Sequence, residues 1–253
     1  MTSALDLSGE LVLISGAAGG LGRPICERLA GLGALVAAVD LRPPEVAGEP
    51  AAGISWYRAD AGDENEVEAL LDDVAGRHGR LPSVVCCHAG VVRAHPILDF
   101  PLEDFDEVMR TNVRAAFVLA KGAARRWRDG AVPGHLIFTS SWVKDFPWPE
   151  IAPYSASKAA LWSLTRSFAK ELAPYGIRAN AVLPGIVSVG MARRQWDEDE
   201  VYRRRASAVI ALGEQQDPAS VADAFAFLCS PLASYMTGSA LRVDGGCSLL
   251  GVD

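Results

Sequence analysis

Two side chains four positions apart, Tyr154 and Lys158, form the pair in this chain with the clearest capacity for chemistry. They bracket the segment Tyr-Ser-Ala-Ser-Lys at the start of a long helical pattern, and residues at i and i+4 share a helix face. A free phenol titrates near ~10, too high for efficient proton exchange at neutral pH. An ammonium about 4 Å away would favour the phenolate by at most roughly 4 kcal/mol, or about three pKa units. The spacing predicts a proton-transfer pair with an acidified phenol; the alternative is a partly exposed Tyr and Lys at a helix start.

Hydroxyl groups end a strand-like run shortly before this pair. Thr139, Ser140 and Ser141 follow the apolar residues that begin at Leu136. A hydroxyl at a strand end can donate a hydrogen bond to a substrate carbonyl and stabilise charge that develops on its oxygen. One of these hydroxyl groups is therefore expected to act together with Tyr154 on a substrate carbonyl.

A glycine-rich turn follows the first strand-like run, in the sequence SGAAGGLG from Ser15 to Gly22, and a helical pattern begins near Arg23. Such a turn lets the backbone approach a pyrophosphate, and the helix N-terminus offers free N–H groups and a positive dipole end. The spacing of Gly16, Gly20 and Gly22 differs from the G-x-G-x-x-G pattern, so an ordinary tight turn is the alternative.

Asp40 strengthens the dinucleotide interpretation. It ends the second strand-like run, 18 residues after Gly22. A carboxylate there can accept hydrogen bonds from the adenosine ribose hydroxyls and would repel a 2′-phosphate, which favours NAD over NADP. Arg42 weakens the preference, since its side chain could turn toward a phosphate. The alternative role of Asp40 is that of a turn residue.

Short aliphatic runs alternate with amphipathic segments along nearly the whole chain. Alternation of this kind predicts βαβ units and a doubly wound, Rossmann-type parallel sheet of about seven strands, with helices on both faces. The expected strands are Leu11–Ile14, Leu35–Val39, Ile54–Tyr57, Val84–Cys87, Leu136–Thr139, Ala179–Leu183 and Ala240–Val243. The expected helices include Glu64–Arg77, Leu102–Arg128, Ser155–Tyr175 and Ala219–Leu228.

No linker or repeat interrupts this order, so residues 1–253 are predicted to form one domain. Residues 188–214 are charged and do not continue the alternation, which predicts an inserted lid over the substrate. A surface loop is expected at Pro43, Pro44, Gly48 and Pro50.

Composition narrows the class of protein. The net charge of −7, with both signs interspersed, disfavours a nucleic-acid partner. Arg203, Arg204 and Arg205 are interpreted as a solvated helix face, with attraction of an anionic substrate as the alternative. The apolar runs are too short to span a membrane and no secretion signal is visible, so the expected location is cytoplasmic. The five cysteines are expected to be reduced and buried, and the four histidines show no metal-ligand spacing.

Taken together, these motifs resemble the short-chain dehydrogenase/reductase family over nearly the full chain. Each motif is weakly specific alone, but their common order and spacing are highly specific. The matching positions are the SGAAGGLG turn with Gly16, Gly20 and Leu21, then Asp40, Asp60, His88-Ala89-Gly90, Asn112, Ser141, the Tyr154–Lys158 segment, Pro184-Gly185, Thr237-Gly238 and Val243-Asp244-Gly245-Gly246.

The resemblance implies a role for each position. Tyr154 would be the general acid in reduction and the base in oxidation, while Lys158 would lower the phenol pKa and hold the nicotinamide ribose. Ser141 would polarise the carbonyl, and Asn112 would hold a water that links Lys158 to solvent. Hydride would pass directly between nicotinamide and carbon, without a metal. The remaining cofactor contacts implied are Asp60 and Ala61 at the adenine, Pro184, Gly185 and Val187 at the nicotinamide, and His88 and Gly90 elsewhere along the cofactor.

Two positions depart from the family pattern. The family usually has Asn-Asn-Ala-Gly where this chain has Cys87-His88-Ala89-Gly90, and we interpret His88 as a structural residue rather than a catalytic one. The family commonly has a threonine that binds the nicotinamide amide where this chain has Val189. Ser188 could replace it, or the contact could be lost.

The substrate is inferred from aromatic and other apolar residues in two regions that border the pocket in this family. These residues are Trp142, Phe146, Pro147 and Trp148 before the catalytic helix, and Met191 and Trp196 in the lid. They favour an apolar, possibly cyclic, alcohol or ketone, unless they only pack the lid or a subunit contact. Two other functions stay open, a 3-oxoacyl thioester reductase and a non-catalytic NAD-binding sensor. The resemblance also implies a homotetramer or homodimer.

Overall fold

The computed structural model describes residues 5–42 and 52–249, so the loop expected around Pro43 to Pro50 lies outside the described residues. The strands are β1 (Leu11–Ser15), β2 (Leu35–Asp40), β3 (Ile54–Arg58), β4 (Val84–Cys87), β5 (Gly134–Thr139), β6 (Ile177–Pro184) and β7 (Ala240–Val243). The helices are α1 (Gly22–Gly31), α3 (Glu64–His78), α4 (Leu102–Met109), α5 (Ala115–Asp129), α6 (Ala152–Leu172), α7 (Gly190–Glu198), α8 (Glu200–Val209) and α9 (Pro218–Cys229).

The strands form one parallel sheet in the order β3-β2-β1-β4-β5-β6-β7. The chain adds strands outward from β1 to β3 and then returns to the other side of β1 at β4. The loops after β1 and β4 therefore diverge, which opens a crevice at the carboxyl edge of the sheet, where ligands bind in such folds. The predicted fold class is confirmed, and every expected strand is present.

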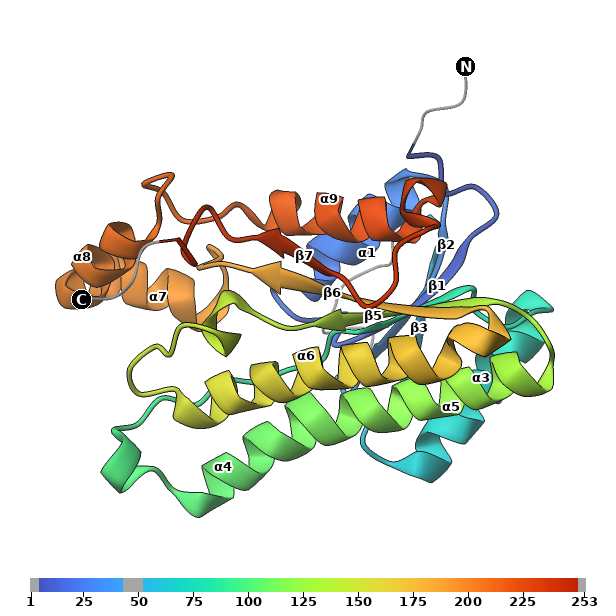
Figure 1. Ribbon diagram of the computed structural model, residues 1–253, viewed down its shortest axis with the longest axis horizontal. Coiled ribbons are helices and arrows are strands. Elements are labelled where there is room, and N and C mark those ends of the chain that lie inside the picture. The colour runs from blue at the N-terminus through green and yellow to red at the C-terminus, as the bar shows by residue number, and fades with distance from the viewer. Residues whose placement is uncertain (1–4, 43–51, 250–253) are drawn as a thin grey trace.

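Helices cover both faces of the sheet (Figure 1). Helices α3, α5 and α6 lie against one face, and α1 and α9 lie against the other. Successive residues of a strand point to opposite faces, so Leu13 packs among the first group and Ile14 among the second. Because both faces are covered, each central strand reads as a continuous apolar run rather than an alternating one.

The long helix expected from Leu102 to Arg128 is interrupted. Helices α4 and α5 are joined by a π-helical turn, Arg110–Arg114, which adds a residue to one turn of an otherwise continuous helical path. The side chain of Asn112 is fully buried in this turn. π-turns within α-helices often occur at functional sites, and this one lies beside the crevice.

Residues 188–214, expected as an inserted lid, contain α7 and α8. These two helices lie beyond the carboxyl ends of the strands, at one end of the molecule (Figure 1). Asp199 caps α8 by accepting hydrogen bonds from the N–H groups of Val201 and Tyr202 at 2.9 and 3.0 Å. In the part of the chain that the structure describes, no helix has the length and apolar character needed to cross a membrane.

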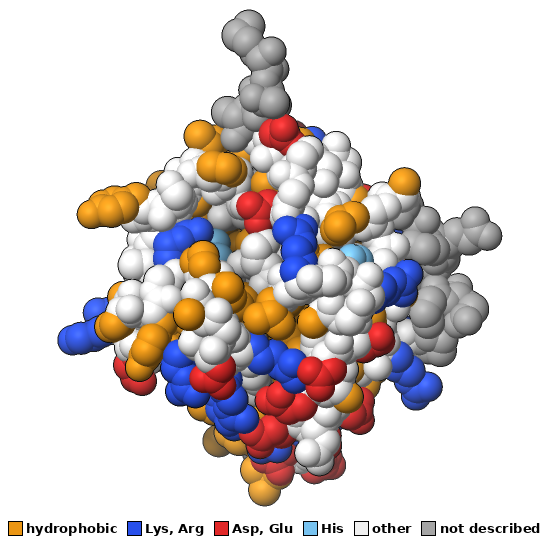
Figure 2. Space-filling view, turned by 90° about the vertical axis from the view of Figure 1, so that its right-hand side faces the viewer, with side chains coloured by type: hydrophobic (Ala, Val, Ile, Leu, Met, Phe, Trp, Pro, Cys, Tyr) orange, Lys and Arg blue, Asp and Glu red, His pale blue; other side chains and the backbone are white. Residues whose placement is uncertain are grey.

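Figure 2 shows the face at the opposite end, away from α7 and α8. Acidic and basic side chains are interspersed over the lower half of this view. Cross-helix ion pairs such as that of Arg126 on α5 with Glu68 on α3, at 2.8 Å, bring opposite charges together in this way.

The five cysteines are buried and unpaired, as expected.

We predict that the fold loses stability in mild acid because His135 is buried in its neutral form. His135 lies in β5, its Nε2 accepts a hydrogen bond from Asn180 at 2.9 Å, and burial lowers its pKa from 6.5 to about 3. The unfolded chain binds a proton below about pH 6.5, whereas the folded chain resists it until about pH 3, so stability falls as pH decreases through this interval. His135→Gln keeps an acceptor for Asn180 and does not titrate. Urea unfolding at pH 7.5 and 4.5 should show an acid-induced loss smaller by about 2 kcal/mol in the variant; equal losses would contradict this account.

Candidate active site

Tyr154 and Lys158 project from the first two turns of α6 toward the carboxyl end of β5. The Lys158 ammonium lies 5.3 Å from the centre of the Tyr154 ring and donates a hydrogen bond to the Thr139 carbonyl at 2.8 Å. Ser140 reinforces this placement, because its hydroxyl donates to the Lys158 carbonyl at 2.7 Å. Two hydrogen bonds thus join the end of β5 to the start of α6, one donated from each element, and they fix the direction of the lysine side chain.

The structure gives pKa shifts different from those expected from the sequence. Burial raises the pKa of Tyr154 to about 12, and a hydrogen bond with Ser141 only partly opposes this. Burial also lowers the pKa of Lys158 to about 8. The expected fall of the phenol pKa below its ordinary value is therefore not found, because desolvation is the largest influence on Tyr154 and the Lys158 ammonium donates its hydrogen bond to a carbonyl instead. Tyr154 is protonated at neutral pH.

Ser141 begins the short turn after β5 and is buried beside Tyr154. Its oxygen accepts a long hydrogen bond, 3.4 Å, from the Val143 N–H. Its hydroxyl also pairs with the Tyr154 phenol, so the two hydroxyl groups lie together where a substrate carbonyl could bind.

Asn112 lies near Lys158, beside Gly90, but the two side chains form no hydrogen bond with each other. Its amide donates to the Val91 carbonyl at 3.0 Å and to the Ser157 hydroxyl at 2.9 Å, and its oxygen accepts from the Val91 N–H at 2.7 Å. Both amide N–H groups are used within the protein, so the side chain holds the loop after β4 against α6. The expected water would have to bind the free lone pair of its oxygen or the backbone of the π-turn.

The glycine-rich turn is shaped by close backbone contacts. Gly16 has φ of +73°, and a Cβ there would lie 2.7 Å from the Ala89 Cα. A Cβ on Gly22 would collide with the Gly16 carbonyl. A Cβ on Gly20 would lie 3.2 Å from the Val189 Cβ, so this turn reaches the loop after β6. Leu21 precedes α1 and gives no side-chain cap, and the Arg23 N–H in the first turn of α1 donates to the Gly19 carbonyl of the glycine-rich turn at 3.1 Å.

Asp40 faces this turn from the end of β2. One carboxylate oxygen accepts from the Ala18 N–H at 3.0 Å, and the other accepts from the Arg42 N–H at 3.1 Å. The Arg42 guanidinium lies 3.4 Å from the same oxygen. Asp40 thus has a turn-stabilising role as well as a position from which it can meet a ribose.

Asp60 and Ala61 lie on the neighbouring loop after β3. Asp60 accepts from the Gly62 N–H at 2.8 Å and pairs with Arg110 at 3.1 Å. Ala61 is buried at the wall of the crevice. The Asp60 side chain bonds to groups of the protein itself, and Ala61 is packed at the surface of the crevice, so both residues shape this part of the wall.

His88 sits behind the crevice, held on two sides. Its Nδ1 lies 3.0 Å from the Thr139 hydroxyl, and its ring meets Phe225 edge to face. Burial and the nearby Lys158 charge lower its pKa to about 3, so it is neutral. The Ser15 hydroxyl accepts from the N–H groups of His88 and Ala89 at 3.1 and 3.2 Å. Ser15 belongs to the predicted glycine-rich turn, but the sequence did not reveal that its hydroxyl holds the loop after β4.

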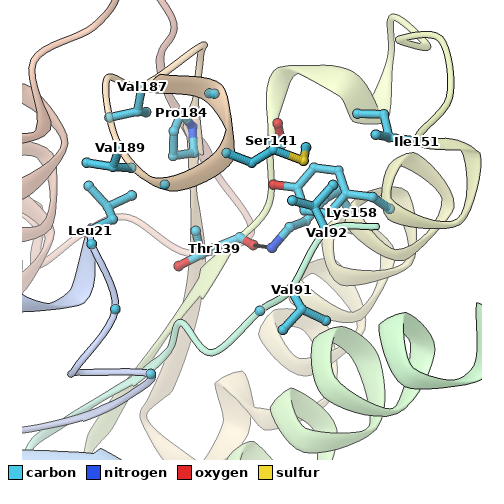
Figure 3. A pocket seen from close by; sticks show the side chains of 18 of the residues that line it. Leu21, Val91, Val92, Thr139, Ser141, Ile151, Lys158, Pro184, Val187 and Val189 are labelled. Carbon is cyan, nitrogen blue, oxygen red and sulfur yellow. Dashed lines mark hydrogen bonds between the residues drawn. The ribbon is translucent and has the colours of Figure 1, made fainter. Parts of the chain in front are cut away.

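One cavity of about 830 Å³ connects these groups (Figure 3). This volume is typical of small-molecule sites, which hold about 300–1,000 Å³. All the predicted site residues line it except Asn112; they are Gly16, Gly20, Leu21, Asp40, Asp60, Ala61, His88, Gly90, Ser141, Tyr154, Lys158, Pro184, Gly185 and Val187. In Figure 3, Leu21, Val187 and Val189 lie on one side of the cavity, and Ser141, Lys158 and Ile151 on the other.

Val189 and Ser188, at the second departure from the family pattern, lie in different environments. Val189 lines the cavity, whereas the Ser188 hydroxyl accepts a hydrogen bond from Arg193 at 3.1 Å. Ser188 is therefore engaged elsewhere. Replacement of the usual threonine contact by Ser188 is not supported.

The aromatic and methionine side chains expected at the substrate side divide into two groups. Trp142, Trp148 and Met191 line the cavity, together with Tyr202 of α8, which the sequence reading did not identify. Phe146 and Trp196 instead pack into the small core beneath α7 and α8. Trp148 contacts both Trp142 and Tyr202 edge to face, with ring centres 5.8 and 5.9 Å apart. These rings form a continuous apolar wall near Tyr154.

The doubly wound sheet, the glycine-rich turn and the Ser-Tyr-Lys group at one cavity define a dinucleotide-dependent oxidoreductase. Comparison with known proteins agrees: the family model described as enoyl-(acyl carrier protein) reductase matches residues 16–248. The (3R)-3-hydroxyacyl-CoA dehydrogenase of Rattus norvegicus is 35% identical over 97% of this chain and 99% of its own. Short-chain dehydrogenase reductase 5 of Arabidopsis thaliana is 37% identical over 98% of each chain.

A solved short-chain type dehydrogenase/reductase from Mycobacterium marinum superposes with a TM-score of 0.87, at 32% identity and over 98% of both chains. The chain belongs to the short-chain dehydrogenase/reductase family. It is an NAD(P)-dependent oxidoreductase that acts on CH–OH groups and the corresponding carbonyls.

Proposed function

We propose that this protein is an NAD-dependent dehydrogenase or reductase for an apolar, cyclic secondary alcohol or ketone. The observation that carries the proposal is the placement of Ser141, Tyr154 and Lys158 at one end of the cavity, beside the aromatic wall. The glycine-rich turn, whose close contacts leave no room for a Cβ, fits the diphosphate of the cofactor at the other end. When bound, the nicotinamide supplies or accepts the hydride.

Side chains of the protein would bind the carbonyl oxygen of the substrate and transfer the proton. Ser141 donates a hydrogen bond to the carbonyl oxygen and orients it. Tyr154, protonated at neutral pH, gives its proton to that oxygen in reduction and takes it back in oxidation. Lys158 lies within 5.3 Å of the phenol ring and stabilises negative charge on its oxygen in the oxidation direction.

A panel assay that follows NADH absorbance tests the substrate class. Cyclic and steroidal ketones should give higher kcat/KM than small sugars of comparable size, because Trp142 and Trp148 offer aromatic surface to an apolar ring. A clear preference for a small sugar would refute the apolar-pocket proposal while leaving the oxidoreductase class intact.

A second candidate, reduction of a 3-oxoacyl thioester, is favoured by one observation. Arg205 lines the cavity with its guanidinium 5.9 Å from the centre of the Trp148 ring. Its neighbours are engaged, Arg203 with the Trp196 carbonyl and Arg204 with Glu200. Arg205 could therefore receive the phosphates of an acyl carrier at the cavity mouth, although Glu150 also lines the cavity and opposes an anion. Acyl-CoA substrates in the same panel decide between the two candidates.

For the cofactor, we propose NAD as the preferred form. Relatives of known structure include a 3-ketoacyl-(acyl-carrier-protein) reductase with NADH and a gluconate 5-dehydrogenase with NADP, so the choice depends on the residues of each chain. In this chain a 2′-phosphate beside the ribose would meet the Asp40 carboxylate, whose charge Arg42 offsets only from the exposed side.

We predict that Asp40→Ala shifts the ratio of kcat/KM for NAD over NADP by about 10- to 100-fold toward NADP, because it removes about 1.4–2.8 kcal/mol of discrimination. Arg42→Ala is the matched control and should shift the ratio toward NAD. Efficiency at least tenfold higher with NADPH in the unmodified protein would overturn the assignment.

We also propose that the enzyme is cytoplasmic and forms a homotetramer or homodimer. Apolar side chains are exposed along α4 and α5, including Leu102, Phe105 and Phe117. Burial of such a patch between copies would remove it from water. Native mass measurement tests the oligomeric state.

A further inference from the structure

Adjacent glutamines between α8 and α9 contact the two segments that border the cavity after β6. Gln215 and Gln216 precede α9, and the sequence reading assigned them no role. Both are half-buried. Their side chains bind different partners, one in the loop after β6 and one in α7.

Gln216 holds the loop that leaves β6. Its side-chain oxygen accepts from the Gly185 N–H at 2.9 Å. Its backbone N–H donates to the Ile186 carbonyl at 2.9 Å, and its carbonyl accepts from the Ser188 N–H at 2.9 Å. Gln216 and Val187 thus form a short parallel β-bridge outside the sheet.

The same glutamine ties this loop to the rest of the fold. Its side-chain N–H donates to the Ser220 hydroxyl at 3.0 Å, in the first turn of α9. Helix α9 packs against α1, which begins at the glycine-rich turn. The turn itself touches the far end of the loop, where Gly20 meets Val189. Gln216 therefore links the loop after β6 to α9, which packs on the helix that follows the glycine-rich turn.

Gln215 holds the next segment instead. Its side-chain N–H donates to the Ala192 carbonyl of α7 at 3.1 Å. Met191, Ala192 and Gln195 of α7 line the cavity at its substrate side. Loss of this bond would loosen α7 without removing any bond to residues 185–188.

We propose that Gln216 is a positioning residue for the cofactor loop and Gln215 a positioning residue for α7, so that the pair divides control of cofactor affinity and substrate affinity. The proposal rests on the proposed function, in which residues 184–187 border the nicotinamide and α7 borders the substrate. Neither residue is expected to touch substrate or to exchange a proton.

Two substitutions of matched shape test this division in the full-length protein. Gln216→Leu removes both side-chain bonds and leaves the backbone bridge; it should raise the Kd for NADH about tenfold and change the KM for the ketone less than twofold. Gln215→Leu should do the reverse, with KM raised about fivefold and Kd for NADH changed less than twofold. NADH fluorescence gives Kd, and steady-state rates give KM.

Gln216→Glu provides the rescue that separates positioning from general stability. It keeps an oxygen acceptor for the Gly185 N–H, so NADH affinity should return to within about threefold of the unmodified protein. Equal effects of the two leucine variants on both constants, no effect on either, or failure of Glu to rescue would each overturn the proposal. Lack of NADH binding and turnover in the unmodified protein would instead refute the proposed function.

Discussion

Tyr154→Phe is expected to lower kcat/KM for ketone reduction by a factor of about 10³ or more while NADH affinity stays within about threefold. The substitution removes one oxygen from a buried ring and keeps its shape. Without the phenol, the carbonyl oxygen retains the Ser141 hydroxyl but loses its proton donor. Stopped-flow rates at saturating NADH, together with NADH fluorescence titration, separate chemistry from binding.

The pH dependence of the unmodified enzyme should differ between reduction and oxidation. With a Tyr154 pKa near 12, the phenol carries its proton throughout the range from pH 6 to 9, so reduction should be independent of that group there. Oxidation needs the phenolate, whose fraction rises tenfold per pH unit below the pKa. The oxidation rate should therefore increase with pH, and Tyr154→Phe should abolish the increase.

Tyr175→Phe is the matched control, since it removes the same oxygen from an exposed tyrosine just beyond the other end of α6. Its rates should equal those of the unmodified enzyme. If Tyr154→Phe retains near-normal turnover, or if both variants lose activity alike, the proton-transfer role of Tyr154 is wrong.

The sheet was predictable because its sequence signal is local. The runs Leu11–Ile14 and Val84–Cys87 are apolar at every position, as strands covered on both faces must be, and both appear in the structure within one residue of their expected bounds. Strands β5 and β6 begin two residues earlier than expected. The glycine-rich turn and the Tyr-Lys spacing are equally local. Fold class and the main site residues therefore followed from short stretches read one at a time.

What the sequence did not reveal depends on contacts between distant segments. The carbonyl that receives the Lys158 ammonium belongs to Thr139, and the amide that receives the Gln216 side chain belongs to Gly185. Neither partner is marked by residue type, since the acceptor and donor are backbone groups. The π-turn was also not predictable, because the helical sequence pattern continues through Arg110–Arg114 and does not show the extra residue. Asn112 is the buried residue of this turn.

The direction of the Tyr154 pKa was missed for a related reason. Spacing along α6 places an ammonium near the phenol, but only the packed structure shows how completely both groups are removed from water. Desolvation disfavours both charged forms, so it raises the tyrosine pKa and lowers that of the lysine. Charge attraction estimated from spacing alone is an upper bound for such a pair.

Lys158→Met is expected to lower kcat/KM by about 10²- to 10³-fold and to weaken NADH binding about tenfold, yet to stabilise the folded protein near neutral pH. Methionine keeps the length of the side chain and removes the ammonium. Two proposed roles are lost with it, the stabilisation of phenolate charge and the contact with the cofactor ribose. Activity and binding should therefore fall together, unlike in Tyr154→Phe.

The gain in stability follows from the lowered pKa of the lysine. Burial lowers it from 10.5 to about 8, so the folded state holds the proton less tightly than the unfolded chain does. The charged lysine therefore costs stability below about pH 8, and the cost fades as pH rises toward 10.5, where both states lose the proton. Chemical denaturation at pH 7 should show Lys158→Met more stable by on the order of 2 kcal/mol, and by much less at pH 10. A variant that is destabilised at both pH values would show that the ammonium is held by favourable contacts rather than against its desolvation.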